Sequence, residues 1–426
     1  MCFRRTPFFD TSPQTKTKKP SKKRGETKSM ADKVYLGGTH RLADPRAWSP
    51  AGAPKPGDNL TIQSGTVNTT NSDIEGKSIF LDRTGSAPVI FNMKNAFLGA
   101  GSPITTVSED GAVVINTTGN VVNASTIEDA HGALDINVSG AGTFATFDNT
   151  GNIIAPAGTE PTVIGISVSQ DAAFSNAGQM TATGSGYNDG TIDISGLGAF
   201  NNSGHMTAAG GDIFASIGGS FINSGSIGAT GASGFAEISF GGSALVNNGT
   251  IGGGNVFLGA AGGGVVDNNN TLDSGNGTLT IAAAVKQSAS ATTNVDDGSL
   301  VLESSMSGGN VTISSGMLEF GGTHGSIGFI GEASAAGFSS TLNISAGGTL
   351  QFDGTSNLSE MLKGNNLMVY EQPSPTAAKS QIADIHLNSA MYSASSFHVQ
   401  GSQITYVPPT SGNQQSAGPA HCSVWG

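Results

Sequence analysis

The stretch Phe200-Asn-Asn-Ser-Gly-His-Met206 contains the pattern that decides the fold. It has an apolar residue at each end, an Asn at the third position and a Gly at the fifth. The phrase occurs seven times at spacings of 21 to 27 residues, with small variations at the fifth position. Its copies begin at Val121, Phe147, Phe174, Phe200, Phe221, Leu245 and Val266. A repeat of this length is typical of a solenoid, in which each repeat forms one coil and stacks on the next.

A second alternating segment separates successive copies of the phrase. Examples are Leu134-Asp-Ile136, Thr191-Ile-Asp-Ile194, Phe235-Ala-Glu-Ile238 and Thr278-Leu-Thr-Ile281. Each period therefore contains at least two segments in which apolar and polar residues alternate, with Gly-rich turns between them. This arrangement predicts an all-β fold, a right-handed single-stranded parallel β-helix, whose solenoid repeats occupy residues 111–355.

Stacking explains the repeated Asn. Equivalent residues of successive coils lie about 4.8 Å apart, so each residue contacts its own counterparts above and below. An amide can donate to one counterpart and accept from the other, whereas a charge would repel its copy. We expect an asparagine ladder and, beside it, an inward column of Phe, with structural rather than ligand-binding roles. The ladder residues are Asn123, Asn149, Asn176, Asn202, Asn223, Asn247 and Asn268.

Composition and charge agree with a solenoid and exclude some partners. Gly accounts for 63 of 426 residues and charged residues for only 12%, so long amphipathic helices are poorly supplied. No Lys or Arg occurs between Lys94 and Lys286. The central body therefore lacks the basic surface that a phosphate backbone requires, and we expect no nucleic-acid partner.

The ends of the chain differ from its middle. Residues 1–34 are basic and expected to be disordered, with Met30 as an alternative start of translation. Residues 35–110 are expected to form an N-terminal cap and the first coils. Residues 356–408 are predicted to form a C-terminal cap that contains one helical turn at Ser359–Lys363, and residues 409–426 a disordered tail. Cys2 and Cys422 lie in the two tails, so no disulfide framework is predicted. No cleavable signal peptide and no membrane-spanning apolar segment is visible in the sequence.

Two parts of the sequence resemble a known group of proteins. The run Ala199-Phe-Asn-Asn-Ser-Gly-His-Met-Thr-Ala-Ala-Gly210 and its neighbours at 220–229 and 244–254 are similar to the repeats of filamentous-haemagglutinin and autotransporter-type adhesins. Residues 45–62, with Trp48 and a Pro-rich turn before Gly-Asp, resemble the opening segment of many secreted bacterial β-helix proteins. The resemblance covers about residues 45–355 and implies a bacterial β-helical shaft that is exported to the cell surface.

The sequence predicts no catalytic, cofactor-binding or metal-binding residues and no cofactor. Polysaccharide lyases of this fold use a basic side chain, and the best-defined coils contain none. The carboxylate pair Asp296-Asp297 is expected to lie in a turn, and the isolated His205 is expected to face solvent. The segment Gly184-Ser-Gly-Tyr-Asn-Asp-Gly190 is a single loose match to a calcium-binding nonapeptide, so no calcium site is predicted.

The function that these features favour is a non-catalytic, secreted or surface-exposed structural or adhesin-like β-helix protein. Its expected location is extracellular or at the cell surface, reached by non-classical or type I export. Host or environmental glycans or surface proteins are the expected partners. The alternative is a carbohydrate-active β-helix enzyme, either a polysaccharide lyase or a glycosidase. An ice-binding or phage-fibre solenoid has less support, because no flat Thr-x-Thr array recurs in register.

Overall fold

The computed structural model describes most of the chain between residues 31 and 409. The described residues are 31–55, 58–70, 78–81, 89–99, 103–106, 112–129, 133–140, 142, 144–156, 163–184, 190–231, 234–241, 244–321, 337–355, 357–389 and 392–409. The predictions for Cys2, Met30 and Cys422 and for nearly all of both tails lie outside these residues, as does most of the segment 184–190.

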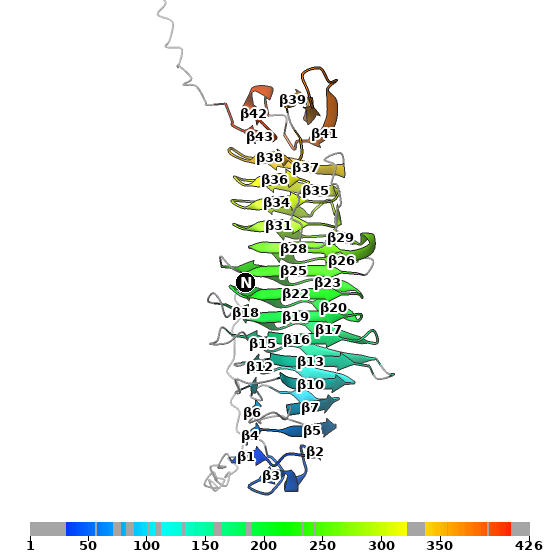
Figure 1. Ribbon diagram of the computed structural model, residues 1–426, viewed down its shortest axis with the longest axis vertical. Helices are drawn as coiled ribbons and strands as arrows, with labels where there is room; N and C mark the ends of the chain where they lie inside the picture. The colour runs from blue at the N-terminus through cyan, green and yellow to red at the C-terminus, as the bar shows by residue number, and fades with distance from the viewer. Residues whose placement is uncertain are drawn as a thin grey trace, which may run out of the picture.

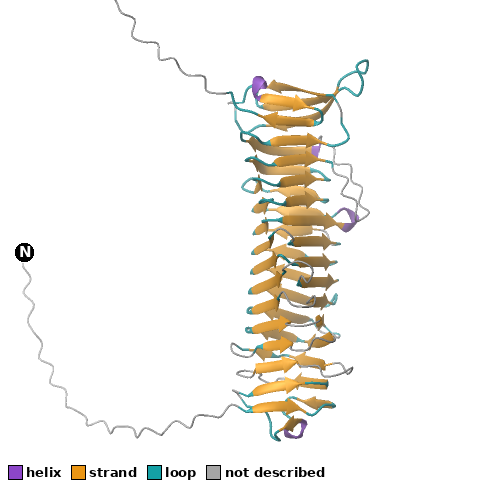
Figure 2. Ribbon diagram, turned by 60° about the vertical axis from the view of Figure 1, so that its left-hand side comes forward, coloured by secondary structure: helices purple, strands orange, loops and turns teal. Residues whose placement is uncertain are grey.

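The chain winds into a parallel β-solenoid, with strands stacked along one long axis (Figures 1 and 2). A central coil consists of three strands, for example β19 (Thr191–Gly196), β20 (Ala199–Asn202) and β21 (His205–Ala209). The seven-residue phrase itself forms a strand, a corner and a strand, because Asn202 ends β20 and His205 begins β21. The sequence predicted at least two strands in each coil, and the structure has three.

One wall of the solenoid is a 16-stranded sheet, named sheet B. Its strands from β2 to β38 are parallel, and β43 and β42 join antiparallel after β38. In spatial order they are β2 (Thr39–Arg41), β5 (Gly65–Thr70), β7 (Val89–Lys94), β10 (Ala112–Thr118), β13 (Ala133–Ser139), β16 (Val163–Val168), β19, β22 (Asp212–Ile217), β25 (Phe235–Phe240), β28 (Asn255–Ala260), β31 (Thr278–Ile281), β34 (Ser299–Leu302), β36 (Met317–Phe320), β38 (Thr349–Phe352), β43 (Gln403–Tyr406) and β42 (Phe397–Gln400).

The other walls belong to a 24-stranded sheet, named sheet A, which is folded at the Asn corners. Its strands are β1 (Asp32–Tyr35), β3 (Trp48–Ser49), β4 (Asn59–Ile62), β6 (Ser78–Leu81), β8 (Phe97–Leu98), β9 (Ile104–Thr106), β11 (Asn120–Asn123), β12 (Thr126–Asp129), β14 (Ala145–Asn149), β15 (Asn152–Ala155), β17 (Ala172–Asn176), β18 (Gln179–Thr183), β20, β21, β23 (Phe221–Asn223), β24 (Ser226–Thr230), β26 (Ala244–Asn247), β27 (Thr250–Gly252), β29 (Val265–Asn268), β30 (Thr271–Asp273), β32 (Ala284–Gln287), β33 (Thr292–Val295), β35 (Met306–Ile313) and β37 (Phe338–Ile344).

A small antiparallel sheet follows the last coil. It contains β39 (Leu358–Lys363), β40 (Asn366–Glu371) and β41 (Ser380–His386). The helical turn predicted at Ser359–Lys363 is therefore wrong. All six residues of β39 pair with β40, and these backbone pairings override the local preference of a short Glu-Met-Leu-Lys run for helix. Three 3-10 turns complete the described structure: η1 (Pro45–Ala47), η2 (Ala261–Gly263) and η4 (Ala394–Ser396).

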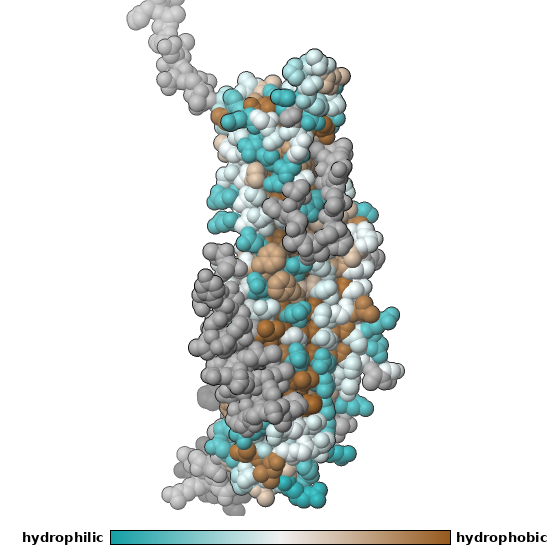
Figure 3. All heavy atoms as spheres, viewed as in Figure 1, coloured by the Kyte–Doolittle hydropathy of each residue, from teal (hydrophilic) through white to brown (hydrophobic). Residues whose placement is uncertain are grey.

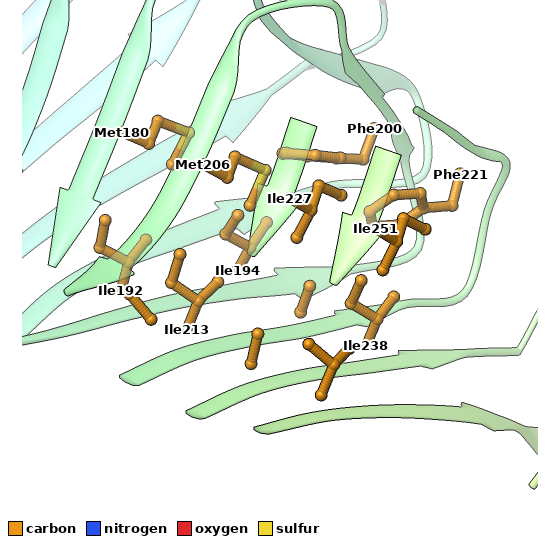
Figure 4. Packing of buried hydrophobic residues seen from close by; sticks show 14 of the residues in the cluster. Met180, Ile192, Ile194, Phe200, Met206, Ile213, Phe221, Ile227, Ile238 and Ile251 are labelled. Carbon is orange, nitrogen blue, oxygen red and sulfur yellow. The ribbon is translucent and has the colours of Figure 1, made fainter. Parts of the chain in front are cut away.

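The core is a set of columns in which like residues stack. Met180, Met206, Ile227 and Ile251 form one column in successive coils, and the labelled side chains point into the same interior (Figure 4). The predicted Phe column is confirmed. The rings of Phe147 and Phe174 stack at 5.3 Å and 5°, and those of Phe174 and Phe200 at 5.5 Å and 2°. Leu245 continues this column above Phe221, as expected.

The corner glycine has a steric reason. A Cβ on Gly204 would overlap the carbonyl oxygen of Gly178, one coil earlier. The same overlap would arise at Gly225 with the carbonyl of Gly204. Successive corners are therefore in direct backbone contact, and a side chain at Gly204 or Gly225 would force the backbone to shift.

Candidate functional site

The inner asparagine ladder is present and continuous. Each Nδ2 donates to the Oδ1 of the Asn in the next coil, at 2.7 Å from Asn123 to Asn149, 2.7 Å to Asn176 and 2.8 Å to Asn202. The chain of bonds continues at 2.7 Å to Asn223, 2.8 Å to Asn247 and 2.8 Å to Asn268. All seven side chains are at most 1% exposed. They are therefore inaccessible to a ligand, which agrees with the structural role predicted for them.

At each end of the ladder, another group takes the place of the next Asn side chain. Nδ2 of Asn268 donates to Oε1 of Gln287 at 3.0 Å, and Nε2 of Gln287 donates to the carbonyl oxygen of Gly308 at 3.3 Å. At the other end Oδ1 of Asn123 accepts from the backbone N–H of Ser125 at 3.1 Å. The terminal amides thus keep hydrogen-bond partners although the Asn repeat stops there.

A second amide ladder lies on the outer face of sheet B, and the sequence analysis missed it. Asn92 donates to Asn68 at 2.8 Å, Asn116 to Asn92 at 2.9 Å and Asn137 to Asn116 at 3.1 Å. Each of these residues follows Val, Ile or Phe, at spacings of 24, 24 and 21. That pattern could have revealed the ladder. Its amides donate toward the N-terminal end, opposite to the inner ladder.

Serines occupy the same outward column in the following coils. Ser167, Ser195, Ser216 and Ser239 are in register on β16, β19, β22 and β25, and Gly259 follows on β28. Ser195, Ser216, Ser239 and Gly259 of this column border a shallow groove of about 330 Å³ that spans four coils. Beside it, Glu237 accepts a hydrogen bond from Ser239 Oγ at 3.2 Å. This groove is the candidate binding site, and sequence reasoning did not identify it.

Three carboxylates gather further along sheet B. Glu303 is 6% exposed, and Glu319 and Asp353 lie near it on the next two coils. Burial, followed by the hydrogen bond with Asp353 and the charges of Asp353 and Glu303, raises the pKa of Glu319 to about 7. Gln351 Nε2 donates to Asp353 Oδ1 at 3.1 Å. This cluster is a place where stability depends on pH.

The residues that the sequence excluded as sites lie apart from the groove. Asp296 and Asp297 are at a bend and accept hydrogen bonds from the hydroxyls of Ser314 and Ser315, as expected for a turn. His205 is exposed, and its Nδ1 lies 2.6 Å from Ser226 Oγ. Within the described ranges no group of three His, Cys, Asp or Glu is placed to hold a metal ion. Among those same residues there is also no helix long and apolar enough to span a bilayer.

Comparison with known proteins does not extend these observations. The chain matches no protein-family model, no curated protein and no solved structure. The fold and its ladders therefore define the class, a parallel β-solenoid with an internal asparagine ladder.

Proposed function

We propose that this chain is a non-catalytic, surface-exposed rod that displays its long outer faces to glycans or proteins in the environment. The observation that carries the proposal is continuity. The inner ladder and the apolar columns pass through successive coils without a break, so neighbouring coils are joined by both backbone and side-chain bonds. A stack joined in this way is stiff, which suits a shaft that holds a surface away from its support.

The antiparallel elements at both ends support the same proposal. An open solenoid end presents unpaired strand edges that can recruit another chain. At the N-terminal end, the buried Trp48 donates from Nε1 to the carbonyl oxygen of Leu42 at 2.9 Å, and β3 pairs antiparallel with β1. At the other end, β43 pairs antiparallel with β38. We propose that these segments act as caps and keep the rod from associating end to end.

Shape and turnover test the proposal together. Thirteen steps of about 4.8 Å between β2 and β38 give a body about 60 Å long, without its end elements. Small-angle scattering should give the distance distribution of a rod. Incubation with pectin, alginate and glucans, followed by reducing-end and unsaturated-product assays, should show no product. A spherical particle would contradict the shape, and turnover of any of these polysaccharides would contradict the non-catalytic role.

One observation favours the carbohydrate-active enzyme as a second candidate. Asp193 and Glu237 occupy the same outward column of sheet B, two coils apart and on either side of Phe214. Their backbones are thus separated by about 9.6 Å. The carboxyl groups of inverting glycosidases are about 6.5 to 9.5 Å apart. If turnover is found, Asp193→Asn and Glu237→Gln should each abolish it.

A further inference from the structure

We propose that the groove on sheet B binds one linear, uncharged glycan chain, which lies along the solenoid axis across β19, β22, β25 and β28. The inference deepens the proposed display function and rests on it, because it names the class of ligand that the displayed face takes. Figure 3 shows the molecule in the same view as Figure 1, in which β19, β22, β25 and β28 are labelled. In the middle of this view, hydrophobic residues lie at the surface between hydrophilic ones.

Two neighbouring positions that line the groove are glycines, and one of them leaves its floor uncovered. Gly218 and Gly241 follow β22 and β25, and both line the groove. A Cβ on Gly218 would lie 2.7 Å from Cδ2 of Leu197, so the Leu197 side chain covers that glycine. A Cβ on Gly241 would meet nothing closer than the Cα of Gly218 at 3.6 Å. The floor at Gly241 is therefore bare backbone with room above it.

Hydroxyl groups line one side of the groove at the interval of the coils. Ser195, Ser216 and Ser239 stand in register, about 4.8 Å from coil to coil. Ser239 donates to Glu237, whereas the hydroxyls of Ser195 and Ser216 form no hydrogen bond with any residue that the structure describes. Each hydroxyl can both donate and accept, which matches the hydroxyls of a sugar.

Apolar surfaces stand beside these polar groups. The ring of Phe257 leans over Gly259, where a Cβ would lie 2.7 Å from Cε1 of the ring and 3.6 Å from Ser239 Oγ. Gly259 thus interrupts the serine column and leaves space for an aromatic ring. At the other end Leu197 is 64% exposed. These surfaces suit the C–H faces of a pyranose, which are apolar although its rim is polar.

Charge and polarity exclude other ligand classes. No Lys or Arg occurs between Lys94 and Lys286, and Asp193 and Glu237 face outward in these coils. An anionic chain would be repelled. A wholly apolar ligand would cover serine hydroxyls and the Glu237 carboxylate without replacing their hydrogen bonds to water, which is unfavourable. An uncharged polyhydroxylated chain meets neither obstacle.

Isothermal titration calorimetry on the full chain tests the inference with defined hexasaccharides and one cationic hexapeptide. The neutral probes are cellohexaose, maltohexaose, laminarihexaose and mannohexaose, the anionic probe is hexagalacturonic acid, and the cationic probe is hexalysine. We expect at least one neutral probe to bind with a Kd of about 1 mM or lower and the anionic probe not to bind. Gly241→Leu places a side chain on the bare floor and should weaken binding at least about tenfold. Phe257→Ala should weaken it about twofold to tenfold.

Thr207→Leu is the matched control. Thr207 faces outward on β21, in the coil of β19 but on sheet A, so the same bulk is added away from the groove. Its affinity should equal that of the unmodified chain. Equal affinity of Gly241→Leu and Thr207→Leu would overturn the inference, as would the absence of binding to every neutral probe. Binding of hexalysine alone, abolished by salt, would also overturn it, because attraction to the carboxylates would then suffice. If the glycan inference fails in any of these ways, the scattering should still be that of a rod. The proposed display function fails separately, when scattering shows a spherical particle.

Discussion

Replacing Asn202 by Asp in the inner ladder changes one atom and tests the whole register. Nδ2 of Asn202 donates to Asn223 Oδ1 at 2.7 Å and to the carbonyl oxygen of Ser226 at 3.2 Å. An ionised carboxylate would place an acceptor against both of these acceptors, in a side chain that is 1% exposed. A neutral carboxylic acid restores one donor. We therefore expect the folded Asn202→Asp protein to keep this carboxyl protonated, with its pKa raised above the value in the unfolded chain.

The size of the effect follows from the cost of holding the proton. Each pH unit above an unfolded pKa of about 3.9 costs about 1.36 kcal/mol, so neutralisation costs about 1.5 kcal/mol at pH 5 and about 4 kcal/mol at pH 7. The second lost hydrogen bond adds about 1 kcal/mol at either pH. The folded pKa is raised, so stability is greatest below the unfolded pKa and declines as pH rises toward the folded pKa. The destabilisation should grow by about 2.7 kcal/mol from pH 5 to pH 7.

Urea unfolding followed by far-UV circular dichroism at both pH values measures this difference. Asn248→Asp is the control, because Asn248 is exposed and its side chain acts as an acceptor. Its Oδ1 accepts a hydrogen bond from Asn269 Nδ2 at 2.9 Å. A carboxylate keeps that bond, and its effect should stay within about 0.5 kcal/mol. Equal destabilisation of Asn202→Asp at pH 5 and pH 7, no larger than that of the control, would refute the buried ladder.

Other substitutions probe the corner, the core and the carboxylate cluster. Gly204→Ala should lower the free energy of unfolding by more than about 2 kcal/mol, because its Cβ would overlap a backbone carbonyl. Gly241→Ala should change it by less than about 0.5 kcal/mol, and urea unfolding midpoints compare the two variants. Phe174→Ala should cost about 3 to 5 kcal/mol, because the ring stacks on both sides, and a loss below 1 kcal/mol would contradict that packing. The folded pKa of Glu319 is raised to about 7, so its contribution to the free energy of unfolding falls as pH rises through that value. Between about pH 5 and pH 8 this loss of stability should be on the order of 1 kcal/mol, after discounting for solvent screening, and Glu319→Gln should remove it. A dependence of melting temperature on pH that the substitution leaves unchanged would contradict this.

The fold could be predicted from the sequence because its interactions are between like residues. The spacing of Asn176, Asn202 and Asn223 fixed which atoms meet, since the same residue type recurs at the same place in each coil. The turn at Asp296-Asp297 followed from local chemistry in the same way. The strand β39 could not be predicted so readily, because its conformation depends on pairing with β40 rather than on its own residues.

The groove escaped prediction for a related reason. Ser195 and Gly241 are unremarkable in a chain rich in both residue types, and only the register of four coils brings them to one hollow. The orientation of Phe257 over Gly259 also depends on side-chain packing rather than on spacing. Such a site has no sequence motif, because its residues come from four coils and the hollow between them depends on which side chains are small.

The inner ladder also has a consequence for how such a chain can change length during evolution. Every coil presents a donor on one side and an acceptor on the other, and all the inner amides point the same way. A duplicated coil therefore finds a matching partner above and below, and a deleted coil leaves two ends that fit each other. At the two ends of the ladder another group takes the place of the neighbouring Asn, a backbone N–H at Asn123 and the Gln287 side chain at Asn268. Gene duplication can thus extend or shorten the rod by whole coils without redesign of either end.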